Sequence, residues 1–74
     1  MEEERKKIGA VLTRLRTKYP NYQFEHRKRF ESKEHSFTMM QGGTIIRDIF
    51  VDMEHFQDNS EETIVDELIK KVSG

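Results

Sequence analysis

The sequence predicts a single small α+β domain in the order α-β-β-β-α, with a three-stranded antiparallel sheet packed on two helices. Apolar residues recur at helical spacing near both ends of the chain, and the middle alternates with a period of two. A Gly-Gly pair interrupts this alternation as a hairpin turn would. With 74 residues there is room for one hydrophobic core, so residues 1–74 are treated as one domain.

The first predicted element is an amphipathic helix over residues 2–18. Its apolar stripe has helical spacing and consists of Ile8, Val11, Leu12 and Leu15. Three leading glutamates suit the positive end of the helix dipole, and Pro20 ends the pattern. Lys7, Arg14 and Lys18 fall along one flank of the helical wheel, so the helix is expected to carry a basic side.

Two strands are expected next, over residues 22–31 and 36–41, with a polar connection between them. Alternation in the first strand turns one set of side chains toward the helices, namely Tyr22, Phe24, His26, Lys28 and Phe30. Arg27 and Arg29 then point away from the helices, between two glutamates, so this outward row is formally neutral. Such a row is typical of a solvated face on which exposed ion pairs contribute little.

Residues 44–56 fit two interpretations. As a strand over residues 45–51 they complete the sheet, and Gly42-Gly43 is a two-residue turn, because glycine adopts positive φ without a Cβ clash. As a helix they form one stripe of Ile45, Ile46, Ile49, Phe50, Met53 and Phe56. The β-branched residues and the hairpin signal favour the strand. The alternative order is α-β-β-α-α, with residues 44–56 helical.

The last predicted element is a helix that follows three residues able to cap it, Asp58, Asn59 and Ser60. Its apolar stripe consists of Ile64, Val65, Leu68, Ile69 and Val72. Lys70 and Lys71 complement the negative end of its dipole. We expect this helix to pack beside the first one.

Several kinds of chemistry are not expected from this sequence. There is no cysteine, and the GxSxG, HExxH and phosphate-loop patterns do not occur. The three histidines, His26, His35 and His55, are irregularly spaced. A local acidic group, Asp52, Glu54, His55 and Asp58, would not converge on a strand. We therefore expect a non-enzymatic protein without a metal or cofactor.

The sequence also predicts a cytoplasmic protein that does not enter a membrane. No apolar run approaches the length of a membrane span. The first residues, MEEERKK, are highly charged, whereas a signal peptide needs an apolar run and a small-residue cleavage site. The absence of cysteine fits a reducing compartment.

Charge is unevenly distributed along the chain. Up to Ser36 there are ten lysines and arginines against six acids, a net charge of +4, and beyond it three against eight, a net charge of −5. This asymmetry is consistent with a polar partner or with head-to-tail self-association. It is equally consistent with each half solubilising its own elements.

An alternative function is nonspecific electrostatic binding of nucleic acid. The basic residues that would carry it are Lys7, Arg14 and Lys18, with Arg27 and Arg29. The α-β-β-β-α order is similar to that of double-stranded-RNA-binding domains, which place a lysine cluster at the start of the second helix. This chain has acids there instead, namely Asp58, Glu61 and Glu62. Sequence-selective recognition is therefore not expected.

The preferred function is interaction with a protein partner or with a second copy as a homodimer. A regular third strand has more apolar residues than one face can bury, so either Ile46 with Phe50, or Ile45 with Ile49 and Val51, lies on the outer face. A β-bulge would instead turn both groups inward. We place the interface at Ile46 and Phe50, because exposed apolar patches mark interaction sites. The partner, the pathway and the oligomeric state stay open.

Overall fold

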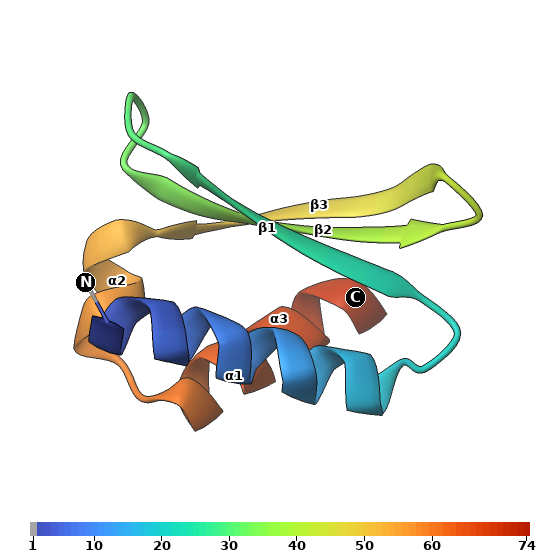
Figure 1. Cartoon of the computed structure of the whole chain (residues 1–74), viewed down its shortest axis with the longest axis horizontal. Coiled ribbons are helices and arrows are strands. Elements are labelled where there is room, and N and C mark those ends of the chain that lie inside the picture. The colour runs from blue at the N-terminus through green and yellow to red at the C-terminus, as the bar shows by residue number, and fades with distance from the viewer. Residues whose placement is uncertain (1) are drawn as a thin grey trace.

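The structure, a computed structural model that describes residues 2–74, has the element order α-β-β-β-α-α (Figure 1). Its elements are α1 (Glu2–Lys18), β1 (Gln23–Arg29), β2 (Glu34–Gln41), β3 (Thr44–Asp52), α2 (Met53–Asp58) and α3 (Glu61–Ser73). The predicted α+β fold, with a three-stranded antiparallel sheet packed on helices, is confirmed. The structure adds α2, a short helix that follows β3 directly.

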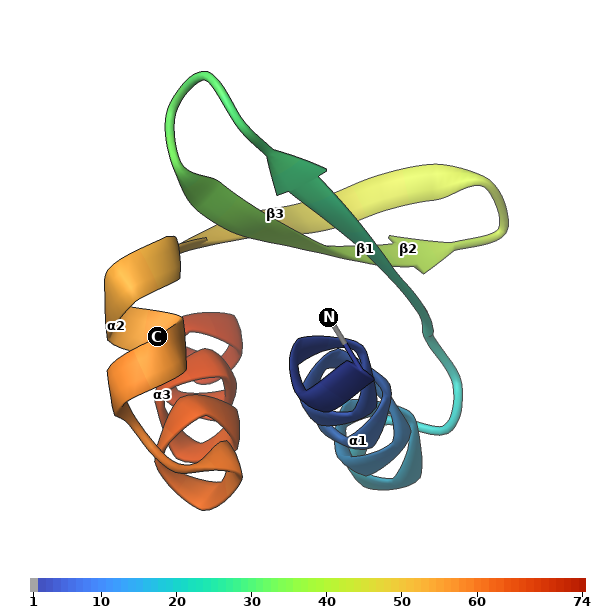
Figure 2. The ribbon, with the colours of Figure 1, turned by 60° about the vertical axis from the view of Figure 1, so that its left-hand side comes forward.

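The strands form the antiparallel order β1-β2-β3, so β1 and β3 are the edges of the sheet. Phe24 of β1 lies opposite Met39 of β2, and Phe37 of β2 lies opposite Ile49 of β3. All four side chains are buried on the face that meets the helices. Figure 2 shows α1 and α3 side by side below this face, while within residues 2–74 no element covers the other face.

The two long helices contribute their predicted stripes to the core. Its buried helical residues are Val11, Leu15, Phe56, Ile64, Val65 and Leu68. Of the three capping candidates, Ser60 is the N-cap of α3, and its hydroxyl accepts a hydrogen bond from the backbone N–H of Thr63 at 3.2 Å. Asn59 instead closes α2, because its side-chain amide donates to the carbonyl of His55 at 2.8 Å. No helix within residues 2–74 combines the length and apolar composition needed to cross a membrane.

Residues 44–52 form a strand, so the helical alternative for residues 44–56 is wrong over most of its length. The turn before this strand explains the outcome. Gly42 has φ of 56° and Gly43 has φ of 81°, as a tight hairpin between β2 and β3 requires. Once the turn directs the chain back along β2, strand pairing satisfies the backbone groups that a helix would otherwise use.

The short helix α2 accounts for the rest of the helical pattern. The Asp52 carboxylate accepts hydrogen bonds from the backbone N–H groups of Glu54 and His55, at 3.1 and 3.3 Å, and so caps the helix that begins at Met53. Phe56, one turn later, is buried in the core. The helical spacing of Met53 and Phe56 therefore reflects α2 rather than a helix from residue 44.

The beginning of β3 contains a β-bulge. Met39 lies opposite Arg47 while Met40 lies opposite Ile45, so Ile46 is an extra residue without a partner on β2. The prediction considered a bulge that would turn both apolar groups inward. This bulge buries neither isoleucine, because the helices do not reach below this end of the hairpin (Figure 1).

Two expectations about side-chain direction need correction. Phe30 was expected to face the helices, but β1 ends at Arg29 and the Phe30 side chain is 73% exposed in the turn that follows. Ile45, Ile49 and Val51 were also expected to lie together on one face of the sheet, and they do not share one environment. Ile49 and Val51 are buried in the core, whereas Ile45 is exposed beyond the bulge.

Candidate functional site

The first half of β3 is the most accessible part of the sheet. Residues 41–48 are all exposed, and 61% of Ile45 and 46% of Ile46 are accessible to solvent. Because β3 pairs with β2 on one side only, this segment also presents backbone groups without a strand partner. Bare isoleucines on an unpaired edge favour addition of another strand.

Phe50, the second predicted interface residue, is only half-buried and lies on the outer face of the sheet. The Arg29 guanidinium, from the other edge strand, lies 5.2 Å from the centre of its ring. On β2, Ser36 lies opposite Phe50 and Glu34 lies opposite Arg29, so the arginine reaches the ring diagonally across β2. Since serine is small, Arg29 can cover part of the phenylalanine across β2. Ile46 is therefore the barer of the two residues.

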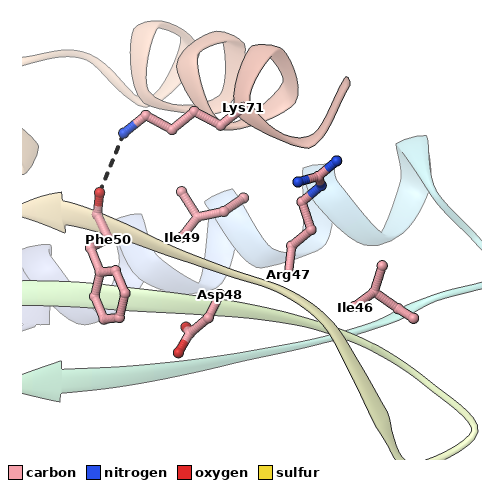
Figure 3. A pocket seen from close by; sticks show the side chains of 6 residues that line it. All are labelled: Ile46, Arg47, Asp48, Ile49, Phe50 and Lys71. Atoms are coloured by element: carbon pink, nitrogen blue, oxygen red, sulfur yellow. Dashed lines mark hydrogen bonds between the residues drawn. The ribbon is translucent and has the colours of Figure 1, made fainter. Parts of the chain in front are cut away.

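Two open grooves follow the free edge of β3 on the side of α3. The first encloses about 400 Å³ and is lined by Ile46, Arg47, Asp48, Ile49, Phe50 and Lys71. The second encloses about 510 Å³ and is lined by Phe50, Val51, Asp52, His55, Glu67, Leu68, Lys70 and Lys71. Figure 3 shows the Lys71 side chain extended from α3 toward the edge, where its Nζ donates to the carbonyl oxygen of Phe50 at 3.4 Å. Phe50 and Lys71 line both grooves, so the two grooves meet at these residues. Together they are called the channel below.

Both grooves carry charges of both signs. Arg47 and Asp48 line the groove near the hairpin, and in Figure 3 the Arg47 side chain points to the same side of β3 as α3. Asp52, Glu67 and Lys70 line the other groove, and Lys71 lines both. The Glu67 carboxylate is 2.7 Å from Nε2 of His55, and both side chains are partly exposed. Acidic and basic side chains are therefore mixed along the channel.

The predicted nucleic-acid residues do not form one surface. Lys7 donates from Nζ to the carbonyl oxygens of Phe56 and Asn59, and its ammonium lies 4.7 Å from the Phe56 ring centre. Arg14 pairs with Glu61 on α3 at 3.3 Å. Two of the three residues predicted on α1 to bind nucleic acid thus make contacts within the fold.

The remaining members of that set lie apart from each other. Lys18 is exposed near the end of α1, in the helical layer. Arg27 and Arg29 are exposed on β1, and the register with Ser36 and Glu34 places them on the outer face of the sheet. The sheet therefore separates these arginines from the basic side of α1.

A histidine pair is the main polar feature of the core. The His35 side chain is fully buried, and its Nδ1 lies 2.8 Å from Nε2 of His26. Its ring centre is 4.3 Å from that of Phe56. Nε2 of His35 has no hydrogen-bond partner within residues 2–74. Since one nitrogen of the 2.8 Å contact must donate and the other accept, one N–H proton lies between the two rings.

Burial is the main cause that lowers the pKa of each histidine below the usual 6.5. For His35 the charge of Glu4 opposes this effect, while Lys28 and Lys7 add to it. For His26 the neighbouring His35 lowers the pKa further. Glu4 accepts a hydrogen bond from Lys28 at 2.6 Å, which lowers the pKa of the Glu4 carboxyl. Both histidines are therefore neutral at neutral pH.

Sequence reasoning missed Arg47 and Lys71 as candidate binding residues. Lys71 was read only as a charge at the end of a helix, and Arg47 as part of an ambiguous segment. The hairpin signal could have indicated Arg47, because it places the residue on an edge strand. Only the packing of α3 beside β3 brings Lys71 to the same groove.

The fold is that of a small α+β protein whose sheet has one uncovered face and an accessible edge at the start of β3. Comparison of the chain with protein-family models, with curated proteins and with solved structures gives no match.

Proposed function

We propose that this protein is a non-enzymatic interaction protein that binds another protein chain, or a second copy of itself, through the free edge of β3. The observation that carries the proposal is the exposure of Ile45 and Ile46 on an edge strand that lacks a second strand partner. Complete burial of a large aliphatic side chain is worth roughly 1.5–3 kcal/mol. Covering these two residues would therefore stabilise a complex appreciably, and added backbone pairing would orient it.

The chemistry of the channel supports binding rather than catalysis. It is open to solvent along the strand, and its polar groups alternate with apolar ones from β3 and α3. An extended chain can use such a surface through its backbone and through alternate side chains. We also propose a cytoplasmic location, which the absence of cysteine supports.

The test compares the wild type with Ile46→Asp and with Gln23→Asp, a matched control on the opposite edge strand. We expect the wild type to retain a protein partner from its host after nuclease treatment, or to show a mass that rises with concentration in light scattering. Ile46→Asp should abolish this association and change the free energy of unfolding by less than about 0.5 kcal/mol, because Ile46 is exposed. Gln23→Asp should leave association intact.

Two results would contradict the proposal. If Ile46→Asp loses its cooperative melt, the residue supports the fold rather than an interface. If the wild type stays monomeric and all captured material disappears after nuclease treatment, the nucleic-acid alternative becomes the better explanation.

A further inference from the structure

We propose that the beginning of α1, residues 2–10, is a pH-sensitive cover, which lies over the His26–His35 pair at neutral pH and moves away from it in mild acid. The cover is separate from the edge of β3, so this device goes beyond the proposed function and does not depend on it. Three features carry the proposal: the burial of the pair, the charges that face it, and the weak anchoring of residues 2–10.

The folded state has no place for a charge on His35. Its side chain is completely buried, and its Nε2 has no hydrogen-bond partner within residues 2–74. Its other nitrogen, Nδ1, faces Nε2 of His26 at 2.8 Å, and its ring packs against that of Phe56, with 4.3 Å between the ring centres. A charged imidazole has an N–H on both nitrogens, so the N–H at Nε2 would be buried without an acceptor. A charged His35 therefore requires a conformation in which water reaches this nitrogen.

The charged groups that face the pair do not offset this cost. Glu4 and Lys7 face it from α1, and Lys28 faces it from β1. The Glu4 carboxylate would attract a proton to the pair, but it already accepts a hydrogen bond from the Lys28 ammonium at 2.6 Å. On the remaining sides the neighbours are uncharged, because β3 places Val51 opposite His35 and α2 contributes an aromatic ring. The lowered pKa of each histidine agrees with a pair that stays neutral while it is covered.

The beginning of α1 is the part of this enclosure that opens most easily. The buried residues of α1 are Val11 and Leu15, whereas none of residues 2–10 is buried. Side-chain contacts hold this segment, through the Glu4–Lys28 pair and through Lys7, which donates to carbonyls at the end of α2 (Figure 1). Segments with few buried contacts open at a lower free energy than the whole molecule. The other walls are paired strands and α2, which is anchored in the core by a buried phenylalanine.

Opening couples to proton uptake. Once the cover has moved, both rings meet water and regain an ordinary histidine pKa near 6.5. Below that pH the open state binds protons that the closed state does not, so acid favours the open state. Between pH 7 and pH 5.5 its population should rise by up to about eightfold for each histidine that is charged only when the cover is open.

Amide hydrogen exchange of the full chain measures this opening residue by residue. It is followed by NMR at pH 7 and pH 5.5, and each rate is corrected for the intrinsic effect of pH. We expect amides of residues 6–10 to exchange faster than those of residues 65–69 at both pH values, and to gain about fivefold or more at pH 5.5. Low concentrations of urea should change the exchange of residues 6–10 little, because a local opening exposes little surface, but should accelerate that of residues 65–69.

Variants test the roles of the pair and of its cover. His35→Phe should remove most of the pH response of residues 6–10, whereas His55→Gln, a change at an exposed histidine, should retain it. If His35→Phe does not melt cooperatively, His26→Gln takes its place, with the same loss of response expected. Glu4→Gln should accelerate exchange of residues 6–10 at pH 7 by about two- to fivefold, because it weakens one partly exposed contact of the cover. The control Glu3→Gln, an exposed glutamate on the same helix, should retain the wild-type rate.

Three results would overturn the proposal. Equal exchange and equal urea dependence of residues 6–10 and 65–69 would show that the opening is global unfolding. Local opening of residues 6–10 without a response to pH, or with a response that persists when the pair is removed, would show that the histidines do not control it. Faster exchange at pH 5.5 in α2 than in residues 6–10 would show that α2, and not the beginning of α1, is the part that moves.

Discussion

His35 shows how a single residue can take a position that its local sequence does not indicate. It lies between Glu34 and Ser36, yet its side chain is fully buried and is hydrogen-bonded to His26. Charging either ring costs free energy, because the surroundings include the rings of Phe37 and Phe56. Charging both rings would also break the N–H···N contact, since both facing nitrogens would then be donors.

This pair makes stability depend on pH. Both folded-state pKa values are lowered from 6.5, so below that pH the unfolded chain binds more protons than the folded one. The free energy of unfolding should therefore fall as pH drops below 6.5, by up to about 1.4 kcal/mol per pH unit for each extra proton. Glu4, whose pKa is lowered from 4.5, adds a further loss at more acidic pH.

Urea unfolding at a series of pH values measures this effect. His35→Phe, which keeps an aromatic ring without a titratable group, should reduce the loss between about pH 7 and pH 5. The control His55→Gln changes an exposed histidine and should retain most of the loss. A wild-type free energy that is flat over this range would contradict the interpretation of the pair.

At the scale of elements, α2 links the sheet to the helical layer. Asp52 caps its start, Phe56 fixes its middle in the core, and Lys7 from α1 binds two carbonyls at its end. These carbonyls have no further turn of helix to satisfy them. The Lys7 ammonium therefore acts as a C-terminal cap supplied by another element, which also fits the negative end of a helix dipole.

Lys7→Met tests this role. The substitution keeps the apolar stem but leaves the carbonyls of Phe56 and Asn59 without their donor, so it should lower the free energy of unfolding by about 1–3 kcal/mol. Lys6→Met, one position earlier on the exposed side of α1, should change it by less than about 0.5 kcal/mol. Equal effects of the two substitutions in urea unfolding would show that the contact is not structural.

At the scale of the whole molecule, the fold distributes charge differently from the linear sequence. The basic residues of the first half lie on α1, below the sheet (Figure 2), and on β1, where Arg27 and Arg29 are on the outer face. Arg14 is also joined to Glu61, from the acidic second half. The cluster that looks cationic in sequence is thus dispersed and partly neutralised, which weakens any long-range attraction to phosphates.

This arrangement predicts weak binding to nucleic acid. A labelled single-stranded oligonucleotide should show no saturable rise in fluorescence anisotropy at about 150 mM salt, because phosphate contacts of this kind are lost steeply with salt. The double substitution Arg14→Glu and Lys18→Glu should then have no effect. Saturable binding at this salt that disappears in the double variant would favour the nucleic-acid function instead.

The sequence by itself determined the α+β class and the positions of most elements. These elements have local sequence patterns. The apolar stripes of α1 and α3 have the helical period, β1 alternates with the strand period, and Gly42-Gly43 allows the positive φ angles of a tight turn. The exposure of Ile46 and the partial exposure of Phe50 could also be predicted, because the helices cover only one face of the strand. The short helix α2 was missed, because six residues hold too few apolar positions to show a period.

Only the tertiary structure decided which surfaces remain for binding. Alternation cannot show where the helices stop covering a sheet, so the exposure of Ile45 and the burial of His35 depend on the placement of the helical layer. The sequence assigned Lys7 to the basic flank of the first helix and Lys71 to the negative end of the last helix's dipole. In the structure Lys7 donates to a backbone carbonyl at the end of α2, and Lys71 donates to a backbone carbonyl at the edge of β3. The physical reason is that ion pairs, caps and grooves join residues distant in the chain, and local patterns carry no information about those distances.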